Sequence, residues 1–201
     1  MISVILPYNK DRGYLHEAIA SVEAQTYKDY ELVLHQGDAS FTHNMNMALK
    51  RANGEYVKIL SEDDQLTPDS LEILISQIAM YDFVYADAEN FGDIGGWPKR
   101  SHDKTVTLES MLIGNGIHGG GVLYKTEILR AVGGFDEALW AAEEYDLHLK
   151  LIKAGYKHSH VEGIVYRYRL HDRNKCAMRS SGPRQRIAKK ELIDRIKQRY
   201  R

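Results

Sequence analysis

Three consecutive acidic residues, Glu62, Asp63 and Asp64, are the side chains of this sequence best suited to chemistry. They follow Ser61 at the end of the apolar run 56–60, which predicts a β-strand. In open α/β sheets, ligands bind at the carboxyl ends of the strands. Carboxylate oxygens at that edge suit a hard divalent cation, Mg²⁺ or Mn²⁺. The competing interpretation is a solvated acidic turn ahead of the next helix, and the strand-end position favours the metal site.

Short apolar runs alternate with helical patterns along most of the chain, and this alternation predicts the elements that position the acidic cluster. It is typical of βαβ units, so we predict an α/β fold with a mostly parallel central sheet flanked by helices. Residues 89–115 lack clear periodicity, which indicates a loop region. Strands are predicted at residues 2–6, 31–34, 56–60, 83–87, 121–124, 157–161 and 165–169, and helices around Leu15, Ile19 and Val22 and at residues 44–51, 71–80, 126–132 and 144–154.

Length, composition and charge exclude several classes of protein. With 201 residues, 43% hydrophobic and 27% charged, the chain fits one globular domain. Its net charge of -1 argues against a nucleic-acid-binding protein, so no nucleic acid is expected as a partner. The single cysteine, Cys176, excludes an internal disulfide framework and indicates a reducing compartment. The first apolar run is too short for a signal peptide, so we expect a cytoplasmic location.

The C-terminal segment, residues 176–201, is a basic tail that we predict to be helical beyond the Gly-Pro break at residues 182–183. Residues 184–201 carry eight Lys and Arg and two acids, with Ile187, Leu192 and Ile196 on a potential apolar stripe. A basic amphipathic helix can bind an anionic membrane surface, which would make the protein peripheral at a membrane. The alternative, which the pattern favours, is a solvated helix that packs its few apolar residues on the body.

Four segments, in this order and spacing, resemble the family 2 glycosyltransferases, the large inverting group with the GT-A fold. The resemblance extends from Ile2 to about His171. It implies a GT-A (Rossmann-like) domain over residues 1–175, ahead of the basic tail. The segments are SVILPYN (residues 3–9) with AIASVEAQTY (18–27), GEYV (54–57) leading into EDD (62–64), VGGFDE (132–137), and EEYDL (143–147) with GY (155–156).

The resemblance implies roles for the acids of the chain. The family motif is typically Asp-x-Asp or Asp-x-Asp-Asp, and Ser61 occupies its first acidic position here, so Asp63 and Asp64 are expected to hold Mn²⁺ or Mg²⁺ against a donor diphosphate. His171 corresponds to the His of the family's Tyr-Arg-x-His ending and is expected at the metal, with an ordinary surface histidine as the alternative. Glu144 stands where the family has its general base, typically Asp. Acids that complement a helix dipole are the alternative interpretation of this segment.

The resemblance also implies a donor site, although the sequence departs from the family there. The family's second strand typically ends in Asp-Asp-Gly-Ser, whereas this chain has His-Gln-Gly-Asp at residues 35–38. The base of the donor, in a UDP-, GDP- or dTDP-sugar, is therefore left open. The expected donor-binding residues are Pro7, Tyr8, Asn9, His35, Gln36, Asp38, Glu62, Asp63 and Arg169.

The function that this resemblance implies is an inverting, metal-dependent, hexosyltransferase-like transfer of a sugar from a nucleotide-diphosphate-sugar to a saccharide or lipid-linked saccharide acceptor. A non-catalytic sugar-nucleotide-binding subunit of a glycan assembly complex is the alternative. It is motivated by Ser61, by residues 35–36, and by Met45 at a position where the family often has Arg. A nucleotidyltransferase is disfavoured, because residues 7–9 do not form a Gly-rich phosphate loop with a basic residue.

Overall fold

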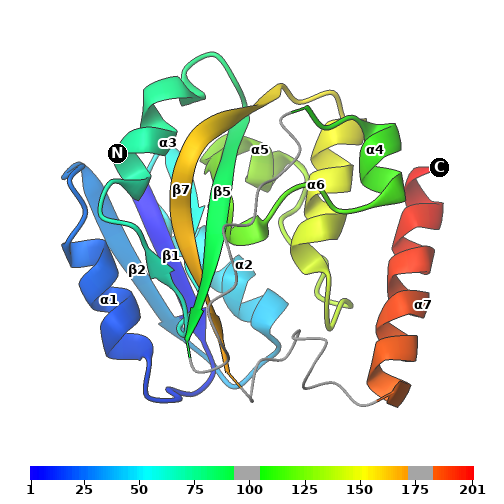
Figure 1. The fold of residues 1–201 in the computed structure, drawn as a ribbon, viewed down its shortest axis with the longest axis horizontal. Coiled ribbons are helices and arrows are strands. Elements are labelled where there is room, and N and C mark those ends of the chain that lie inside the picture. The colour runs from blue at the N-terminus through cyan, green and yellow to red at the C-terminus, as the bar shows by residue number, and fades with distance from the viewer. Residues whose placement is uncertain (93–104, 172–182) are drawn as a thin grey trace.

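The computed structural model describes residues 1–92, 105–171 and 183–201 of the chain. Its centre is a seven-stranded sheet with the strand order β2-β1-β3-β6-β5-β7-β4. The strands are β1 (Ile2–Tyr8), β2 (Tyr30–Gln36), β3 (Tyr56–Ile59), β4 (Gln65–Leu66), β5 (Phe83–Gly92), β6 (Val122–Lys125) and β7 (His158–Leu170). The helices are α1 (Leu15–Glu23), α2 (Phe41–Arg51), α3 (Ser70–Ile78), α4 (Leu108–Ile113), the 3₁₀ turn η1 (Gly119–Gly121), α5 (Thr126–Ala131), α6 (Glu143–Lys153) and α7 (Pro183–Tyr200) (Figure 1).

The sheet is mostly parallel in strand direction, as predicted. β1 pairs in parallel with β2 and β3, and β5 pairs in parallel with β7. β6 lies antiparallel between β3 and β5, so these two run in the same direction, and the short β4 is antiparallel to β7. Strands β1, β2, β3, β5 and β7 therefore end at one edge of the sheet, where β6 begins.

Two hydrophobic clusters cover the two faces of the sheet. Along β1, Ile2, Val4 and Leu6 point into the cluster that α1 and α3 close, whereas Ile5 points into the opposite cluster. This alternation follows from the two-residue period of a strand. The opposite cluster contains residues of α2, α4, α5, α6 and α7. A strand buried on both faces has a continuous apolar sequence, which is why β1 was predicted so readily.

Two predicted boundaries were wrong. The two short strands expected at residues 157–161 and 165–169 form the single strand β7. Register shifts in the β5–β7 pairing, with Gly163 at φ 136°, accommodate the extra residues and let the strand continue. The expected loop at residues 89–115 is shorter, because residues 89–92 belong to β5 and α4 begins after a capping box between Thr107 and Ser110. Residues 93–104 of that loop lie outside the described residues.

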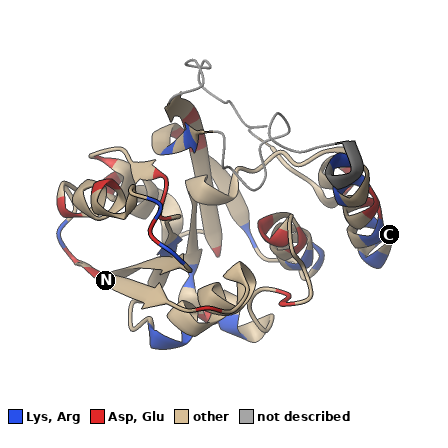
Figure 2. Ribbon diagram, turned by 90° about the horizontal axis from the view of Figure 1, so that it is seen from below, with Lys and Arg blue, Asp and Glu red and all other residues tan. Residues whose placement is uncertain are grey.

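The predicted C-terminal helix is present as α7, and it packs on the body beside α4 and α6 (Figure 1). Leu192 and Ile196 are buried in the core, whereas Ile187 is 60% exposed. Arg199 forms an ion pair with Asp136. The apolar stripe is thus largely used inside the molecule, as the alternative interpretation of the tail predicted. Figure 2 shows basic and acidic residues mixed along this helix.

The predicted domain boundary at residues 175–176 lies outside the described residues, as does Cys176. Among the helices that the structure describes, none is long and apolar enough to cross a membrane.

Candidate functional site

The predicted site residues converge on the edge of the sheet where the five parallel strands end. The acidic cluster follows β3, and Arg169 and His171 lie at the end of β7. The glycine turn η1 precedes β6 at the same edge. Glu144 lies in the first turn of α6, whose N-cap residue, Ala142, adopts a left-handed conformation with φ 60°. The fold therefore brings together residues that are about 100 positions apart in the sequence.

Asp63 and His171 form a direct pair at this edge. Asp63 Oδ2 lies 3.0 Å from His171 Nε2. The His171 side chain is 1% exposed and that of Asp63 is 13% exposed, so the carboxylate retains some access to solvent. The His171 ring also packs against Tyr14, with ring centroids 5.2 Å apart. The structure thus joins two of the three residues predicted to bind metal.

Asp64, the third predicted metal ligand, is buried and has protein donors on both of its oxygens. Tyr166 donates its hydroxyl to Oδ2 at 2.7 Å, and the backbone N–H of Arg169 donates to Oδ1 at 2.8 Å. Burial raises the pKa of Asp64 well above its usual value, the nearby charge of Asp63 adds to this, and the two hydrogen bonds oppose it. These contacts tie the acidic loop to β7.

Arg169 was predicted to contact the donor, but its guanidinium is engaged within the protein. Its Nε donates to the carbonyl oxygen of Asp63 at 2.8 Å, and its Nη2 donates to Glu17 at 2.6 Å. The guanidinium also lies between the rings of Tyr14 and Phe91, 4.4 Å from each centroid. Arg169 therefore fixes the backbone at Asp63.

Glu62 is also buried rather than solvated, and it pairs with Arg12 from the loop after β1. Burial raises the pKa of Glu62 to about 7, with a further contribution from the charge of Asp63, while Arg12 opposes the shift. The two acids Glu62 and Asp64 are thus turned inward on either side of Asp63. This arrangement excludes the solvated acidic turn as an interpretation of the cluster.

The glycine turn η1 lies between the acidic loop and Glu144. A Cβ atom on Gly119 would lie 2.5 Å from Cδ of Glu144, and one on Gly120 would lie 2.4 Å from the ring of Tyr166. A Cβ on Gly121 would meet the carbonyl oxygen of Ala86 at 2.5 Å. At each of the three positions a different close neighbour leaves no room for a side chain, so only glycine fits. The turn therefore packs against both Glu144 and the Tyr166 ring that contacts the acidic loop.

Glu144 is half-buried, and no described residue donates a hydrogen bond to its carboxylate. Burial raises the pKa of Glu144 above the usual carboxyl range. The charge of Glu143 adds to this shift, whereas Lys189 of α7 and Lys58 of β3 oppose it. A carboxylate with a raised pKa and open lone pairs is suited to accept a proton near neutral pH.

The residues predicted to bind the nucleotide meet at the ends of β1 and β2. Pro7 and Tyr8 lie in register with His35 and Gln36. The Tyr8 hydroxyl lies 3.5 Å from the Gln36 side-chain oxygen. Burial lowers the pKa of His35, and the charges of Arg51 and His43 lower it further. Gln36 and Asp38 are exposed at this edge, and Pro7 is buried.

Asn44, a residue that was not predicted, organises the loop after β2. It is fully buried in the first turn of α2. Its side-chain nitrogen donates to Asn9 Oδ1 at 3.0 Å and to the carbonyl of Gly37 at 2.9 Å. Asn9 in turn donates to the carbonyl of Ala39 at 2.7 Å. Asn9 is therefore a residue of the loop scaffold, and these bonds hold the predicted nucleotide edge in shape.

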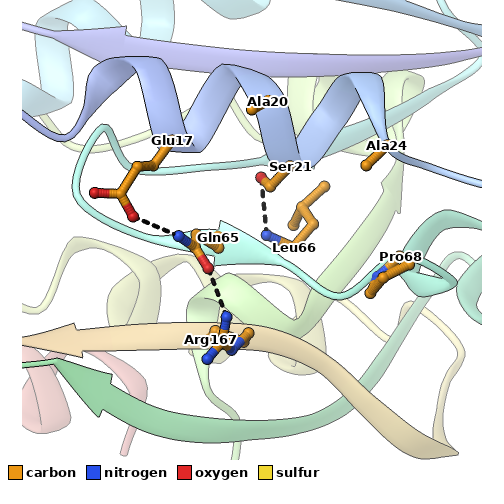
Figure 3. Close-up of a pocket in the computed structure, with 8 residues that line it drawn as sticks. All are labelled: Glu17, Ala20, Ser21, Ala24, Gln65, Leu66, Pro68 and Arg167. Carbon is orange, nitrogen blue, oxygen red and sulfur yellow. Dashed lines mark hydrogen bonds between the residues drawn. The ribbon is translucent and has the colours of Figure 1, made fainter.

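A pocket of about 330 Å³ lies between α1, β4 and β7 (Figure 3). Its walls are largely apolar, with Ala20, Ala24 and Leu66, and a polar chain runs along one end. In that chain Gln65 donates to Glu17 at 2.8 Å and accepts from Arg167 at 2.7 Å. None of the predicted site residues lines this pocket, so it is separate from the candidate site.

Sequence reasoning missed several residues that shape the site. The largest omission is Lys58, a fully buried lysine in the middle of β3. A lysine inside the apolar run 56–60 was a visible signal, because buried lysines are rare unless something compensates for the charge. Tyr166, Arg12 and Glu17 gave no such signal, since their roles arise only when distant segments meet.

Comparison with known proteins identifies the class to which this arrangement belongs. The model of the family described as "Glycosyl transferase family 2" matches residues 34–133, which include the acidic loop but not Glu144 or His171. The chain belongs to glycosyltransferase family 2. It is 24% identical to the putative colanic acid biosynthesis glycosyl transferase WcaA of Escherichia coli, over 76% of this chain and 66% of that protein.

Two solved structures share the fold. TarS 1-349 of S. aureus, in complex with UDP-GlcNAc, aligns with a TM-score of 0.75 and 19% identity, covering 97% of this chain and 66% of that one. The mannosyltransferase PcManGT of Pyrobaculum calidifontis, in complex with GDP-Man and Mn²⁺, aligns with a TM-score of 0.67 and 19% identity, covering 95% of this chain and 64% of that one. The chain spans 22% to 64% of the length of four curated relatives.

Proposed function

We propose that this chain is an inverting, metal-dependent glycosyltransferase that uses a nucleotide-diphosphate-sugar donor and a hydroxyl of a saccharide or lipid-linked saccharide acceptor. The observation that carries the proposal is the placement of two different carboxylates on opposite sides of one glycine turn. Asp63 is paired with His171 on one side, and Glu144 has an open carboxylate on the other. Family membership supports sugar transfer as the reaction.

The residues present fit a divalent cation that is shared with a diphosphate. Among the described residues, no cluster of three or more His, Cys, Asp and Glu side chains forms a complete protein cage. Mg²⁺ and similar cations are usually held by one or two carboxylates together with substrate phosphates and water, so a complete cage is not required. Asp63 and His171 would hold the ion, and Asp64, with both oxygens bound by protein donors, would fix the loop that carries Asp63. When bound, the cation would neutralise charge on the departing diphosphate.

In the proposed reaction Glu144 is the general base. The acceptor hydroxyl oxygen bonds to the anomeric carbon of the donor sugar as its proton passes to the Glu144 carboxylate. The bond between that carbon and the phosphate oxygen breaks in the same step, and the electron pair leaves with the nucleoside diphosphate. A single displacement of this kind inverts the anomeric configuration. The absence of donors on the Glu144 carboxylate from described residues supports this role.

The donor class is supported by the structural neighbours, whose nucleotides differ. TarS 1-349 is in complex with UDP-GlcNAc, and PcManGT is in complex with GDP-Man. The exposed side chains of Gln36 and Asp38 at the end of β2 are the groups that we propose to contact the nucleoside. A panel of UDP-, GDP- and dTDP-sugars with Mn²⁺ in a thermal-shift assay would select the donor, since a ligand that binds only the folded state raises its stability.

The test of the proposal compares Asp63→Asn and Glu144→Gln with matched controls. With the selected donor and Mn²⁺, we expect E144Q to lower kcat by about 10²- to 10⁴-fold, the usual contribution of a general base, with donor affinity retained. We expect D63N to abolish the Mn²⁺-dependent part of donor binding. Asp69→Asn and Glu23→Gln change exposed acids away from the site and should leave both quantities unaltered. Equal turnover in wild type and E144Q would refute the assignment of the base.

The non-catalytic alternative is motivated by the departures from the family pattern at Ser61, at residues 35–36 and at Met45. It predicts that the wild-type chain binds the donor with Mn²⁺ but neither transfers nor hydrolyses the sugar. Donor binding by the wild-type protein, without turnover on any of a set of saccharide and lipid-linked saccharide acceptors, would favour this alternative over the enzyme.

A further inference from the structure

Lys58 is the one fully buried lysine among the described residues, and it lies directly beneath the site. It occupies the centre of the sheet, in register with Val4 of β1 and Leu123 of β6. Its ammonium group donates to the backbone carbonyl of Gly120 at short range and weakly to that of Ile59 at 3.4 Å. These acceptors are neutral, and burying a cation without a bonded carboxylate is costly. The cost of burying this charge suggests that Lys58 has a role in the site.

The first link from Lys58 leads to Glu144 through the glycine turn. Lys58 binds the carbonyl of Gly120, and the adjacent Gly119 has no room for a Cβ because the Glu144 side chain packs against it. The position of this turn therefore determines where the Glu144 carboxylate can lie. The hydrogen bond from Lys58 holds this turn in place.

The second link leads to the acidic loop. The Lys58 ammonium lies 5.0 Å from the centroid of the Tyr166 ring, and the hydroxyl of that ring donates to Asp64. Gly120 packs against the same ring. Both oxygens of Asp64 already have donors, whereas Glu144 has none among the described residues. The charge of Lys58 therefore affects the ionisation of Glu144 more than that of Asp64.

We propose that Lys58 is a positioning residue for the general base, which holds the glycine turn against Glu144 and supplies the buried positive charge that favours the ionised form of its carboxylate. This inference rests on the proposed function for its catalytic consequence, whereas its electrostatic part concerns the protein alone.

Among the described residues, three charged groups affect the ionisation of Glu144. Glu143 of α6 opposes ionisation of Glu144, while Lys189 of α7 and Lys58 of β3 favour it. Burial lowers the pKa of Lys58 to about 7, and the charges of Glu144 and Asp64 oppose that shift. Lys58 is therefore charged on the acidic side of neutrality. Removal of this cation must raise the pKa of Glu144 further.

The direct test is a titration of Glu144 that needs no substrate. The side-chain carboxyl carbons of Glu are labelled with ¹³C, and the Glu144 signal is assigned by its loss in E144Q. In Lys58→Met and Lys58→Gln we expect the Glu144 midpoint to move up by at least about half a pH unit. Lys125→Met is the matched control, because it removes a lysine from the neighbouring strand β6, where it pairs with Asp82 at the other end of the sheet. An unchanged midpoint in both Lys58 variants would overturn the proposal.

A second measurement separates positioning from general damage to the fold. We expect K58M to lower kcat, while KM for the sugar donor stays within about twofold of the wild-type value. K58Q keeps a hydrogen-bond donor for the Gly120 carbonyl, so its kcat should fall less. In the E144Q background K58M should cause no further loss, because Lys58 acts through Glu144. The same fractional loss in both backgrounds would contradict the proposal. If wild type and E144Q turn over equally, the proposed function fails, and the titration still decides the role of Lys58.

The fold of K58M can be followed by its stability against pH. The folded-state pKa of Lys58 is about 7 against 10.5 for an ordinary lysine, so its contribution to stability is present above pH 10.5 and is lost as the pH falls through 7. The free energy of unfolding of K58M should therefore exceed that of wild type most below pH 7. This difference should disappear between pH 7 and 10.5. A cooperative unfolding transition with this pattern shows that the variant is folded and that the buried amine has been removed.

Discussion

Substitution of Gly119 by Ala tests the geometry of the proposed base with one added methyl group. Gly119 does not lie in the left-handed region, so an alanine there meets no backbone strain. The added Cβ would lie 2.5 Å from Cδ, 2.7 Å from Cγ and 2.8 Å from Cβ of Glu144. Rotation of the Glu144 side chain can relieve the first two contacts but not the third, because its Cβ is fixed to α6. Ordinary contact begins near 3.4 Å, so turn and helix must separate by 3.4 − 2.8 = 0.6 Å.

This displacement sets the size of the expected effect. A misplacement of 1 Å can cost about 10²-fold in rate, so a shift of this size together with rotation of the carboxylate should lower kcat by about 10- to 100-fold. Overpacking should also lower the free energy of unfolding by about 1–3 kcal/mol. Donor affinity, measured by calorimetry, should change little, because the methyl group lies on the side of Glu144.

The assay compares steady-state transfer by G119A, by wild type and by Gly114→Ala. Gly114 is the matched control, because a Cβ there meets nothing within 4 Å. In the E144Q background G119A should add little further loss, since the group that it displaces is already inactive. A kcat for G119A within twofold of that for G114A, or an equal loss in both backgrounds, would refute the proposed contact between the turn and the base.

Two further expectations concern the scaffold of the site. Tyr166→Phe removes the hydroxyl that donates to buried Asp64 and accepts from the backbone N–H of Ser61. The free energy of unfolding, measured in urea, should fall by about 1–3 kcal/mol. Transfer should also require more Mn²⁺ to reach its half-maximal rate. Tyr200→Phe removes the hydrogen bond from α7 to buried Asp146 and should lower the free energy of unfolding by about 1 kcal/mol while leaving kcat unchanged. A stable Y166F with wild-type Mn²⁺ dependence, or a Y200F as stable as wild type, would contradict these expectations.

The parts of the fold that the sequence predicted well are those whose signal is local. β1 is buried on both faces, so its apolar run stands out in any window, and the acidic loop follows the next parallel strand directly. The resemblance implied that His171 and Asp63 lie near one metal ion, and the two side chains are in contact because the strands that precede them end at one edge of the sheet. Local pattern and strand order therefore suffice to place the residues near one another.

The orientation of side chains was not predictable in the same way. Arg169 was expected at the donor, and the contacts that orient its guanidinium come from Glu17 and Tyr14, which lie more than 150 residues earlier in the chain. Likewise, β7 continues through Gly163 because a bulge absorbs the extra residues, and a bulge depends on the partner strand. Lys58 appeared only as an interruption of an apolar run. What it binds is set by a turn 62 residues away.

Residue 61 contributes to the site through its backbone. The N–H of Ser61 lies 3.4 Å from the Tyr166 hydroxyl, and that hydroxyl in turn donates to Asp64. Any residue type other than proline supplies this N–H, so the serine leaves the geometry of the acidic loop intact. An acid at residue 61 would add one more carboxylate to the acidic loop. We therefore expect nucleoside recognition to depend mainly on the β1–β2 edge, where Asn44 holds the loop that carries Gln36 and Asp38. A donor-binding screen should therefore respond more strongly to substitutions at that edge than to Ser61→Asp.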